Sequence, residues 1–193
     1  MRVRFLTVLA FGALACGPSA AALSLDLDVV MLEGSGWTRE RALGVVREAT
    51  AILAQCGVAL DRMELRVLAV PPRLMDFSTP AARELARTYP AGRPAVYLVR
   101  DTRSRPAFDA EAIGRSNSRT RPEIADTVWM TAATRDPGIA LAHELAHLLL
   151  DSGEHSEEAG NLMRDETSAG STSLSAAQCT RLRETARANG LLK

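Results

Sequence analysis

Residues 140–150 read ALAHELAHLLL, and the arrangement of the chain follows from this stretch. His143 and His147 are four residues apart, so on a helix their imidazoles lie on one face, about one turn apart. Two imidazoles placed in this way can bind one metal ion, and Glu144 is close enough to reach a water molecule on that ion. The pattern H-E-x-x-H therefore predicts a zinc site in which Glu144 is the general base.

The residues around this motif favour a true site over a chance match. Apolar residues flank it on both sides, as a buried helix requires. Asp136 and Pro137 form a start signal, with Asp136 as the expected cap and proline at the first helical position. The chain has three histidines, and the third, His155, follows shortly after the helix. The alternative is a buried helix that carries two histidines without any metal.

A third metal ligand is expected just beyond the helix, because a catalytic zinc takes three protein ligands and leaves one position for water. Gly153 is expected to bend the chain out of the helix, since glycine adopts positive φ at little cost. His155 follows that bend and is the predicted third ligand. Carboxylates also bind zinc, so four nearby residues stay open as competitors. These are Asp151, Glu154, Glu157 and Glu158.

The composition limits the class of protein. A chain of 193 residues, of which 47% are hydrophobic, suits one domain with a substantial core. The formal net charge is zero, so nothing indicates binding to nucleic acid or to a membrane surface. The apolar run near the N-terminus, residues 5–15, is too short for a transmembrane span.

Residues 1–22 are predicted to be a cleaved signal peptide. Arg2 and Arg4 give it a basic start, and the apolar run of residues 5–15 follows. Residues 20–22 are three alanines, which offer a small-x-small cleavage site. The protein is therefore expected to be exported to the periplasm or the extracellular space.

The mature chain, residues 23–193, is expected to be a single metallopeptidase-like catalytic domain. An alternative to soluble export is lipid attachment at Cys16, which fits less well because a larger aliphatic residue would normally stand three positions earlier.

Export implies an oxidising compartment. Cys56 and Cys179, the two cysteines of the mature chain, are therefore a predicted disulfide, and two separate buried thiols are the alternative.

Hydrophobic periodicity predicts alternating strands and helices along the mature chain. The expected strands are residues 24–32, 60–70, 95–99 and 126–131, with a short edge strand at 112–116; the expected helices, besides that of the motif, are 39–56, 81–88 and 173–189. A strand-helix-strand order of this kind indicates a parallel sheet. Residues 101–121 are polar and are expected to form a surface loop with solvated arginines. These arginines are Arg103, Arg105, Arg115, Arg119 and Arg121.

The segment from His143 to Met163 resembles the metzincins, a clan of zinc-dependent peptidases with the pattern H-E-x-x-H-x-x-G-x-x-H and a later methionine turn. His143, Glu144 and His147 match the first part, and residues 161–163 (Asn-Leu-Met) resemble the turn. The resemblance implies an α/β (α+β) fold with a twisted, mostly parallel sheet and an antiparallel edge strand. It also implies a long backing helix, an active-site helix, a C-terminal helix, and Met163 beneath the metal.

Two departures from the metzincin pattern affect the third ligand. Leu150 stands where the family has its glycine, and the next glycine is Gly153. His155 follows His147 by eight residues instead of six. The chain is therefore expected to have a longer helix or a wider loop before it returns to the metal.

The function implied by the resemblance is that of an exported zinc endopeptidase, with Zn²⁺ as cofactor and a protein or peptide as substrate. The substrate would lie extended beside residues 112–116, and residues 164–172 would form a wall of the pocket next to the cleaved bond. Two other functions stay open. One is a non-catalytic binding protein on a peptidase fold, and the other is a zinc amidase or peptidase that acts on cell-wall peptides.

Overall fold

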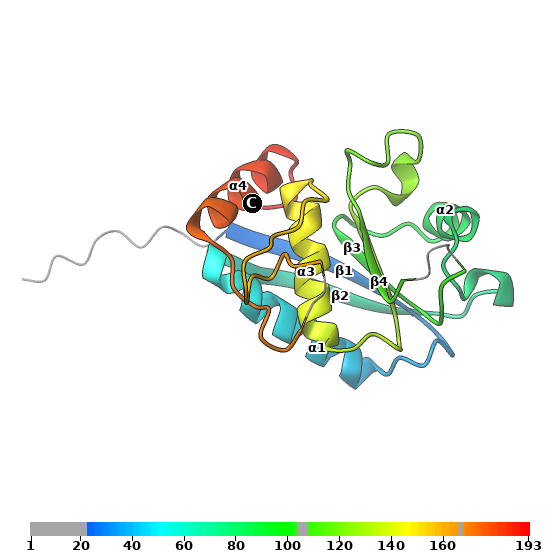
Figure 1. The fold of residues 1–193 in the computed structure, drawn as a ribbon. Coiled ribbons are helices and arrows are strands. Elements are labelled where there is room, and N and C mark those ends of the chain that lie inside the picture. The colour runs from blue at the N-terminus through cyan, green and yellow to red at the C-terminus, as the bar shows by residue number, and fades with distance from the viewer. Residues whose placement is uncertain (1–22, 104–107, 166–167) are drawn as a thin grey trace, which may run out of the picture.

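The computed structural model describes three stretches of the chain. These are residues 23–103, 108–165 and 168–193. The predicted signal peptide, residues 1–22, lies outside them, and so do Cys16 and Arg105. The described residues form one five-stranded sheet in the order β2-β1-β3-β5-β4, with helices packed against it (Figure 1). The predicted α/β fold class is confirmed.

The sheet is mostly parallel, with one antiparallel edge. Its strands are β1 (Leu23–Leu32), β2 (Val58–Leu68), β3 (Ala95–Val99), β4 (Ala110–Ile113) and β5 (Thr127–Thr131). Four of them run parallel, and β4 pairs antiparallel to β5. The edge strand expected at residues 112–116 begins two residues earlier. It ends at Ile113, and the backbone N–H of Ser116 donates to the Asp151 side chain and not to a neighbouring strand.

Four α-helices flank the sheet, and their ends follow ordinary capping chemistry. They are α1 (Arg39–Leu53), α2 (Thr79–Thr88), α3 (Pro137–Leu150) and α4 (Ala176–Ala188). Thr38 caps α1, and Gly57 ends the 3₁₀ turn that follows it with a φ of 70°. A reciprocal capping box of Ser175 and Gln178 starts α4 three residues later than expected. No described helix is long and apolar enough to cross a membrane.

Side chains of the central strands alternate between two hydrophobic cores. In β3, Val96 and Leu98 belong to the core beneath α1, α3 and α4, whereas Tyr97 belongs to the core beneath α2. Trp129 of β5 stacks on Tyr97, with ring centroids 4.2 Å apart. The sheet is therefore the middle layer, with α1, α3 and α4 on one face and α2 on the other (Figure 1).

The polar loop after β3 is held to the sheet by two of its arginines. Arg103 and Arg100 both bind Asp76, a buried carboxylate, with Arg103 Nη2 3.0 Å from Asp76 Oδ2. The Arg115 Nε donates to Asp126, which is also buried, over 2.8 Å. The expectation that these arginines are simply solvated is therefore wrong for Arg103 and Arg115, because buried carboxylates need a charged partner.

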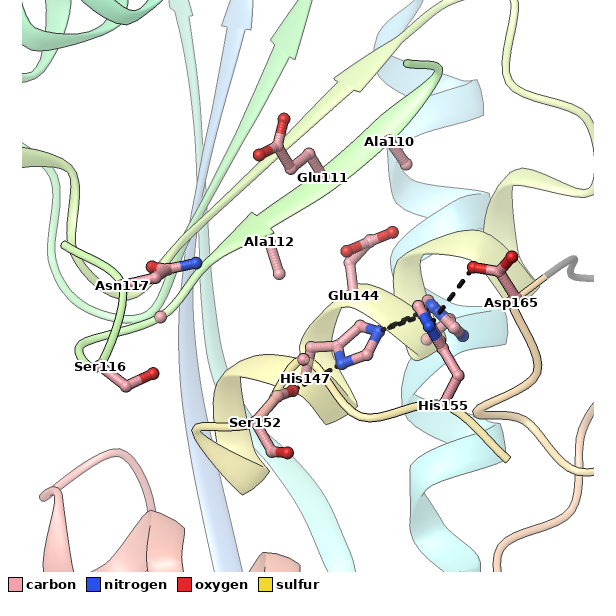
Figure 2. A pocket seen from close by; sticks show the side chains of 13 residues that line it. Ala110, Glu111, Ala112, Ser116, Asn117, Glu144, His147, Ser152, His155 and Asp165 are labelled. Atoms are coloured by element: carbon pink, nitrogen blue, oxygen red, sulfur yellow. Dashed lines mark hydrogen bonds and ion pairs between the residues drawn. The ribbon is translucent and has the colours of Figure 1, made fainter. Parts of the chain in front are cut away.

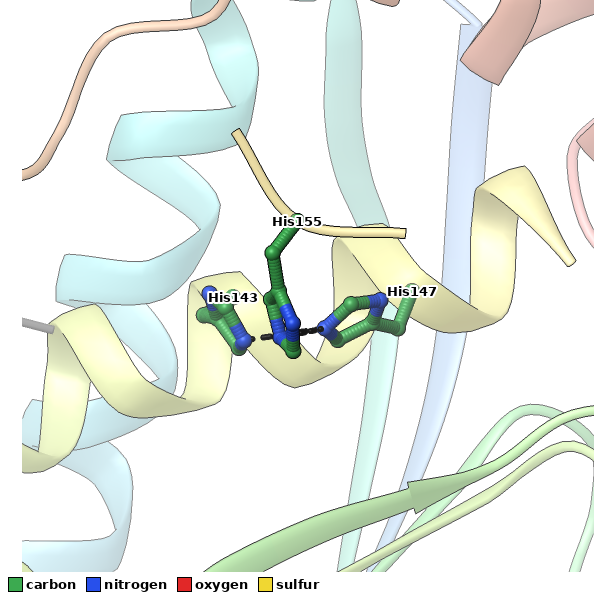
Figure 3. Close-up of side chains that lie close together, drawn as sticks. All are labelled: His143, His147 and His155. Atoms are coloured by element: carbon green, nitrogen blue, oxygen red, sulfur yellow. Dashed lines mark hydrogen bonds between the residues drawn. The ribbon is translucent and has the colours of Figure 1, made fainter. Parts of the chain in front are cut away.

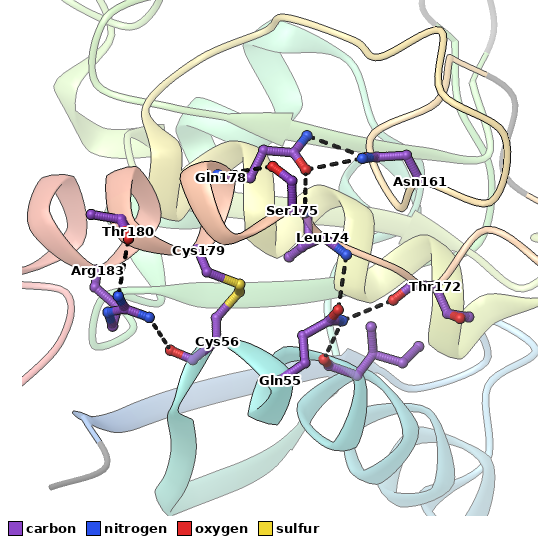
Figure 4. The surroundings of a disulfide bond; sticks show 11 residues. Gln55, Cys56, Asn161, Thr172, Leu174, Ser175, Gln178, Cys179, Thr180 and Arg183 are labelled. Carbon is purple, nitrogen blue, oxygen red and sulfur yellow. Dashed lines mark hydrogen bonds between the residues drawn. A yellow bond between two sulfur atoms is a disulfide. The ribbon is translucent and has the colours of Figure 1, made fainter. Parts of the chain in front are cut away.

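The predicted disulfide is present and joins α4 to the end of α1 (Figure 4). Cys56 and Cys179 are both buried, and they lie 123 residues apart in the sequence. The neighbouring Gln55 donates to the Thr172 carbonyl and accepts from the Leu174 N–H, each over 2.8 Å. The covalent bond and these hydrogen bonds together fix the segment that leads into α4.

A close crossing of α1 and α3 positions the motif helix over the sheet. A Cβ atom at Gly138 of α3 would lie 2.6 Å from the Cβ of Glu48 in α1 and would also overlap the Glu48 carboxylate. The Glu48 Cβ cannot move away unless α1 itself shifts. Glycine at 138 is therefore what allows the two helices to approach.

Substituting Gly138 with Ala is expected to destabilise the fold by about 1–2 kcal/mol. Overpacking costs about 1–3 kcal/mol, and the better helix propensity of alanine offsets at most about 1 kcal/mol of it. Gly44→Ala in α1 is the control, because nothing lies within 4 Å of a Cβ there. Urea unfolding measures both variants, and equal stability of Gly138→Ala and the wild type would contradict the close crossing.

Candidate metal centre

The helix α3 carries the motif through the middle of the molecule. It begins at Pro137 as predicted, but Asp136 makes no side-chain capping bond. Its backbone is left-handed, with a φ of 46°, whereas a capping side chain needs extended backbone at that position. Most of the helix is buried, and Glu144 and His147 are partly exposed. These two side chains therefore face an opening while the rest of α3 packs into the core.

The three histidines converge on one point (Figure 3). His147 Nε2 lies 2.9 Å from His143 Nε2 and 3.2 Å from His155 Nε2. Tetrahedral zinc with Zn–N bonds of about 2.0–2.1 Å holds its nitrogens about 3.3 Å apart. The separations in this cluster therefore suit three ligands of a single ion.

Hydrogen bonds at the opposite ring nitrogens point the Nε2 lone pairs inward. His143 Nδ1 donates to the Leu162 carbonyl and His147 Nδ1 to the Ser152 carbonyl, each over 2.7 Å. A carbonyl only accepts, so the proton of each neutral ring is on Nδ1 and the Nε2 atom has a free lone pair. Lone pairs that face one another repel, and a cation between them removes the repulsion. The donor set therefore fits a divalent metal ion.

Burial keeps two of these imidazoles in the form that binds metal. Desolvation lowers the pKa of His143. It also lowers the pKa of His147 to about 4, and the neighbouring His143 adds to this effect. Both rings are therefore neutral at neutral pH, and metal binding does not have to displace a proton from them.

Glu144 is an acidic residue that faces the same opening. Burial raises the pKa of its carboxyl to about 8, and a hydrogen bond from the Ala112 backbone opposes this shift. A cation at the histidines would favour the carboxylate and bring this pKa down. General bases work best when their pKa is near the working pH. Glu144 can therefore exchange a proton near neutral pH.

The chain leaves α3 at Asp151 and not at Gly153. Asp151 has a left-handed backbone with a φ of 45°, whereas Gly153 has no positive φ, so the predicted role of Gly153 is wrong. Aspartate is among the few residues besides glycine that tolerate this conformation. The Asp151 carboxylate also accepts from the Ser116 N–H over 2.9 Å. The helix thus runs through Leu150, and His155 returns from a longer loop.

The Asn161–Met163 turn lies directly against the histidine cluster. The Leu162 carbonyl in this turn is the hydrogen-bond partner of His143. The Met163 carbonyl accepts from the N–H of Ser156, the residue after His155, over 2.7 Å. The Met163 side chain is buried in the core beneath α3. The turn therefore supports both ends of the metal-binding segment, while contact of the Met163 sulfur with the underside of the site stays a prediction.

A cleft of about 320 Å³ opens in front of the histidines, between them and β4 (Figure 2). Ala110 and Ala112 of β4 line it together with Glu144, and a second hollow continues it past Ala110 and Glu144. The Glu111 side chain points away from the histidines (Figure 2). Small side chains therefore leave the strand edge open to a ligand.

The acidic residues that competed for the third ligand position are not part of the cluster, which holds histidines alone. Asp151 accepts from Ser116, and Glu154 pairs with Arg181 over 3.0 Å. One acidic residue that the sequence did not single out does reach the site. Asp165 contacts His155 and lines both hollows of the cleft. It belongs to the loop expected to wall the pocket, of which residues 166–167 lie outside the described part.

Comparison with solved structures places this arrangement in a known fold. Metalloproteinase-II from Bacteroides fragilis matches with a TM-score of 0.59 at 18% identity, over 87% of this chain. Archaemetzincin from Methanopyrus kandleri matches with a TM-score of 0.53 at 13% identity, over 85% of this chain and 96% of its own. The chain has a metzincin-like fold. This confirms the fold that the resemblance implied.

In length, this metzincin-like chain corresponds to only part of metalloproteinase-II, the larger of the two similar proteins. It spans 55% of metalloproteinase-II. No protein-family model and no curated protein sequence matches the chain. The likeness is therefore one of fold, and the chemistry rests on the residues of the site.

Proposed function

We propose that this protein is an exported zinc-dependent endopeptidase, with residues 23–193 as its catalytic domain. His143, His147 and His155 would hold the zinc ion, and Glu144 would be the general base. The observation that carries the proposal is the convergence of three Nε2 lone pairs beside a partly exposed carboxylate in an open cleft. A purely structural zinc site would be closed by a fourth ligand and would have no use for Glu144.

The proposed chemistry divides between the metal and the chain. A zinc ion at the histidines would polarise a substrate carbonyl and bring the pKa of a water molecule to about 7. Glu144 takes the proton of the attacking water on a carboxylate oxygen and then gives it to the leaving amine. One carboxyl group would therefore take up the proton in the first step and release it in the second.

Several observations support a peptide as the substrate. The strand β4 is at the edge of the sheet, and among the described residues its strand partner is β5, so its other side faces the cleft. An extended peptide binds such an edge by main-chain hydrogen bonds. Both similar structures are named as metalloproteinase or archaemetzincin, which supports peptide hydrolysis as the reaction. Export is supported by the Cys56–Cys179 disulfide, because such bonds persist in oxidising compartments.

Metal analysis combined with a casein or gelatin assay tests the proposal. The purified mature protein is expected to contain one zinc per chain and to cleave the substrate. A chelator should abolish cleavage, and added zinc should restore it, since an open three-ligand site releases and rebinds its metal. Bound zinc without cleavage of any peptide would instead indicate a binding protein. Cleavage restricted to cell-wall peptides would indicate the amidase class.

A further inference from the structure

We infer that Asp165 is a positioning residue that holds the imidazole of His155 in the orientation that binds metal. This inference rests on the proposed function. Asp165 Oδ1 lies 3.3 Å from His155 Nδ1. No H-E-x-x-H motif or spacing rule includes this residue. It acts through His155 and is not one of the three residues that converge on the metal position.

His155 needs such a partner more than the other two histidines do. The rings of His143 and His147 project from α3 and bond to backbone carbonyls. His155 comes from the loop after α3, and its side chain is 36% exposed, whereas His143 is 4% exposed. Fewer packing contacts therefore restrict the ring of His155. Its contact with Asp165 therefore contributes a correspondingly larger share of its orientation.

The contact also selects the tautomer that binds metal. A carboxylate beside Nδ1 favours the tautomer of His155 that has its proton on Nδ1, and this leaves a lone pair on Nε2, which lies 3.2 Å from the Nε2 of His147. Partners of this kind typically contribute about 10–100-fold to metal affinity. Because Asp165 is 86% exposed, competition with water places its effect at the lower end.

One short segment thereby orients two of the three ligands. The Leu162 carbonyl holds His143, and Asp165, three residues later, holds His155. Asp165 also lines both hollows of the cleft, so it lies where these hollows meet, beside the histidines (Figure 2). The segment after α3 thus contributes to the site through its turn and through this carboxylate.

Zinc affinity, measured by equilibrium competition with a chromophoric chelator, tests the role of Asp165. Asp165→Ala is expected to weaken zinc binding about tenfold. Asp165→Asn should lie between Ala and the wild type, because the amide oxygen still accepts from Nδ1–H but has no charge. The absorption spectrum of the Co²⁺-substituted protein should change in Asp165→Ala, since the geometry of one ligand is altered. Thermal unfolding of the metal-free variants should match the wild type, because Asp165 is exposed.

Two further variants show the largest and the smallest loss of zinc affinity to be expected. His155→Ala shows the loss when the ligand itself is missing, and it should exceed that of Asp165→Ala. Glu157→Gln removes an exposed charge two residues from His155 and should leave the affinity nearly unchanged. An Asp165→Ala affinity equal to that of a zinc-binding wild type would overturn the role of Asp165 alone. An equal loss in Glu157→Gln would also overturn it, whereas a wild type without zinc would overturn the proposed function.

Discussion

Replacing Glu144 with Gln should remove peptide hydrolysis and leave the metal site intact. Glutamine has the same shape but cannot accept a proton from water, so kcat/KM is expected to fall by about 10²–10⁴-fold. The three imidazoles are unchanged, because two of them bond to the Leu162 and Ser152 carbonyls and the third contacts Asp165. Steady-state kinetics on a quenched fluorescent peptide and zinc content of the same sample measure the two effects. Cleavage at the wild-type rate by the zinc-loaded variant would exclude Glu144 as the base.

The pH dependence of stability provides an independent check on the same variant. In the metal-free protein, burial raises the pKa of Glu144 from 4.5 to about 8. The folded state therefore keeps a proton that the unfolded state loses between these pH values, so stability falls as the pH rises through this window. The Gln variant lacks this titration. It is expected to unfold at a higher temperature than metal-free wild type at pH 8, and at the same temperature at pH 4.

Removing the disulfide should have the largest effect on stability. The double variant Cys56→Ser and Cys179→Ser is expected to lose about 4–5 kcal/mol, because the bond closes a loop with a sequence separation of 123 residues in the unfolded chain. Denaturant unfolding of the oxidised wild type and the double variant measures the difference. Wild type treated with a reductant is the control and should unfold like the double variant. A difference below about 1 kcal/mol would show that the cysteines act as separate buried thiols in solution.

Sequence patterns correctly predicted the helices and strands whose apolar residues follow a regular pattern. Helical spacing placed His143 and His147 on one face of a buried helix with Glu144 beside them, and the apolar run of residues 95–99 matched β3 at both ends. The conformation of these elements depends mainly on residues that are close in the sequence. It can therefore be predicted from a short stretch of the chain.

The features that sequence patterns missed depend on contacts between distant residues. The bend at Asp151 was expected at Gly153, since glycine is the stronger signal for positive φ, but the Asp151 carboxylate is anchored by Ser116, 35 positions earlier. The shift of β4 has a similar origin, because the Ser116 N–H donates to Asp151 and not to a neighbouring strand. Asp165 lies in an irregular segment, where no periodicity marks a side chain that approaches His155.

The left-handed bend at Asp151 has a consequence for how related enzymes are found in genomes. A regular expression that requires glycine at position 150 and histidine at 153 rejects this chain, since Leu150 and Gly153 stand there. Yet His155 brings its Nε2 to within 3.2 Å of that of His147 across a spacer two residues longer. A third histidine can therefore reach the other two across a longer spacer when an aspartate reverses the chain after the helix, and searches that allow a variable gap would retain sequences like this one.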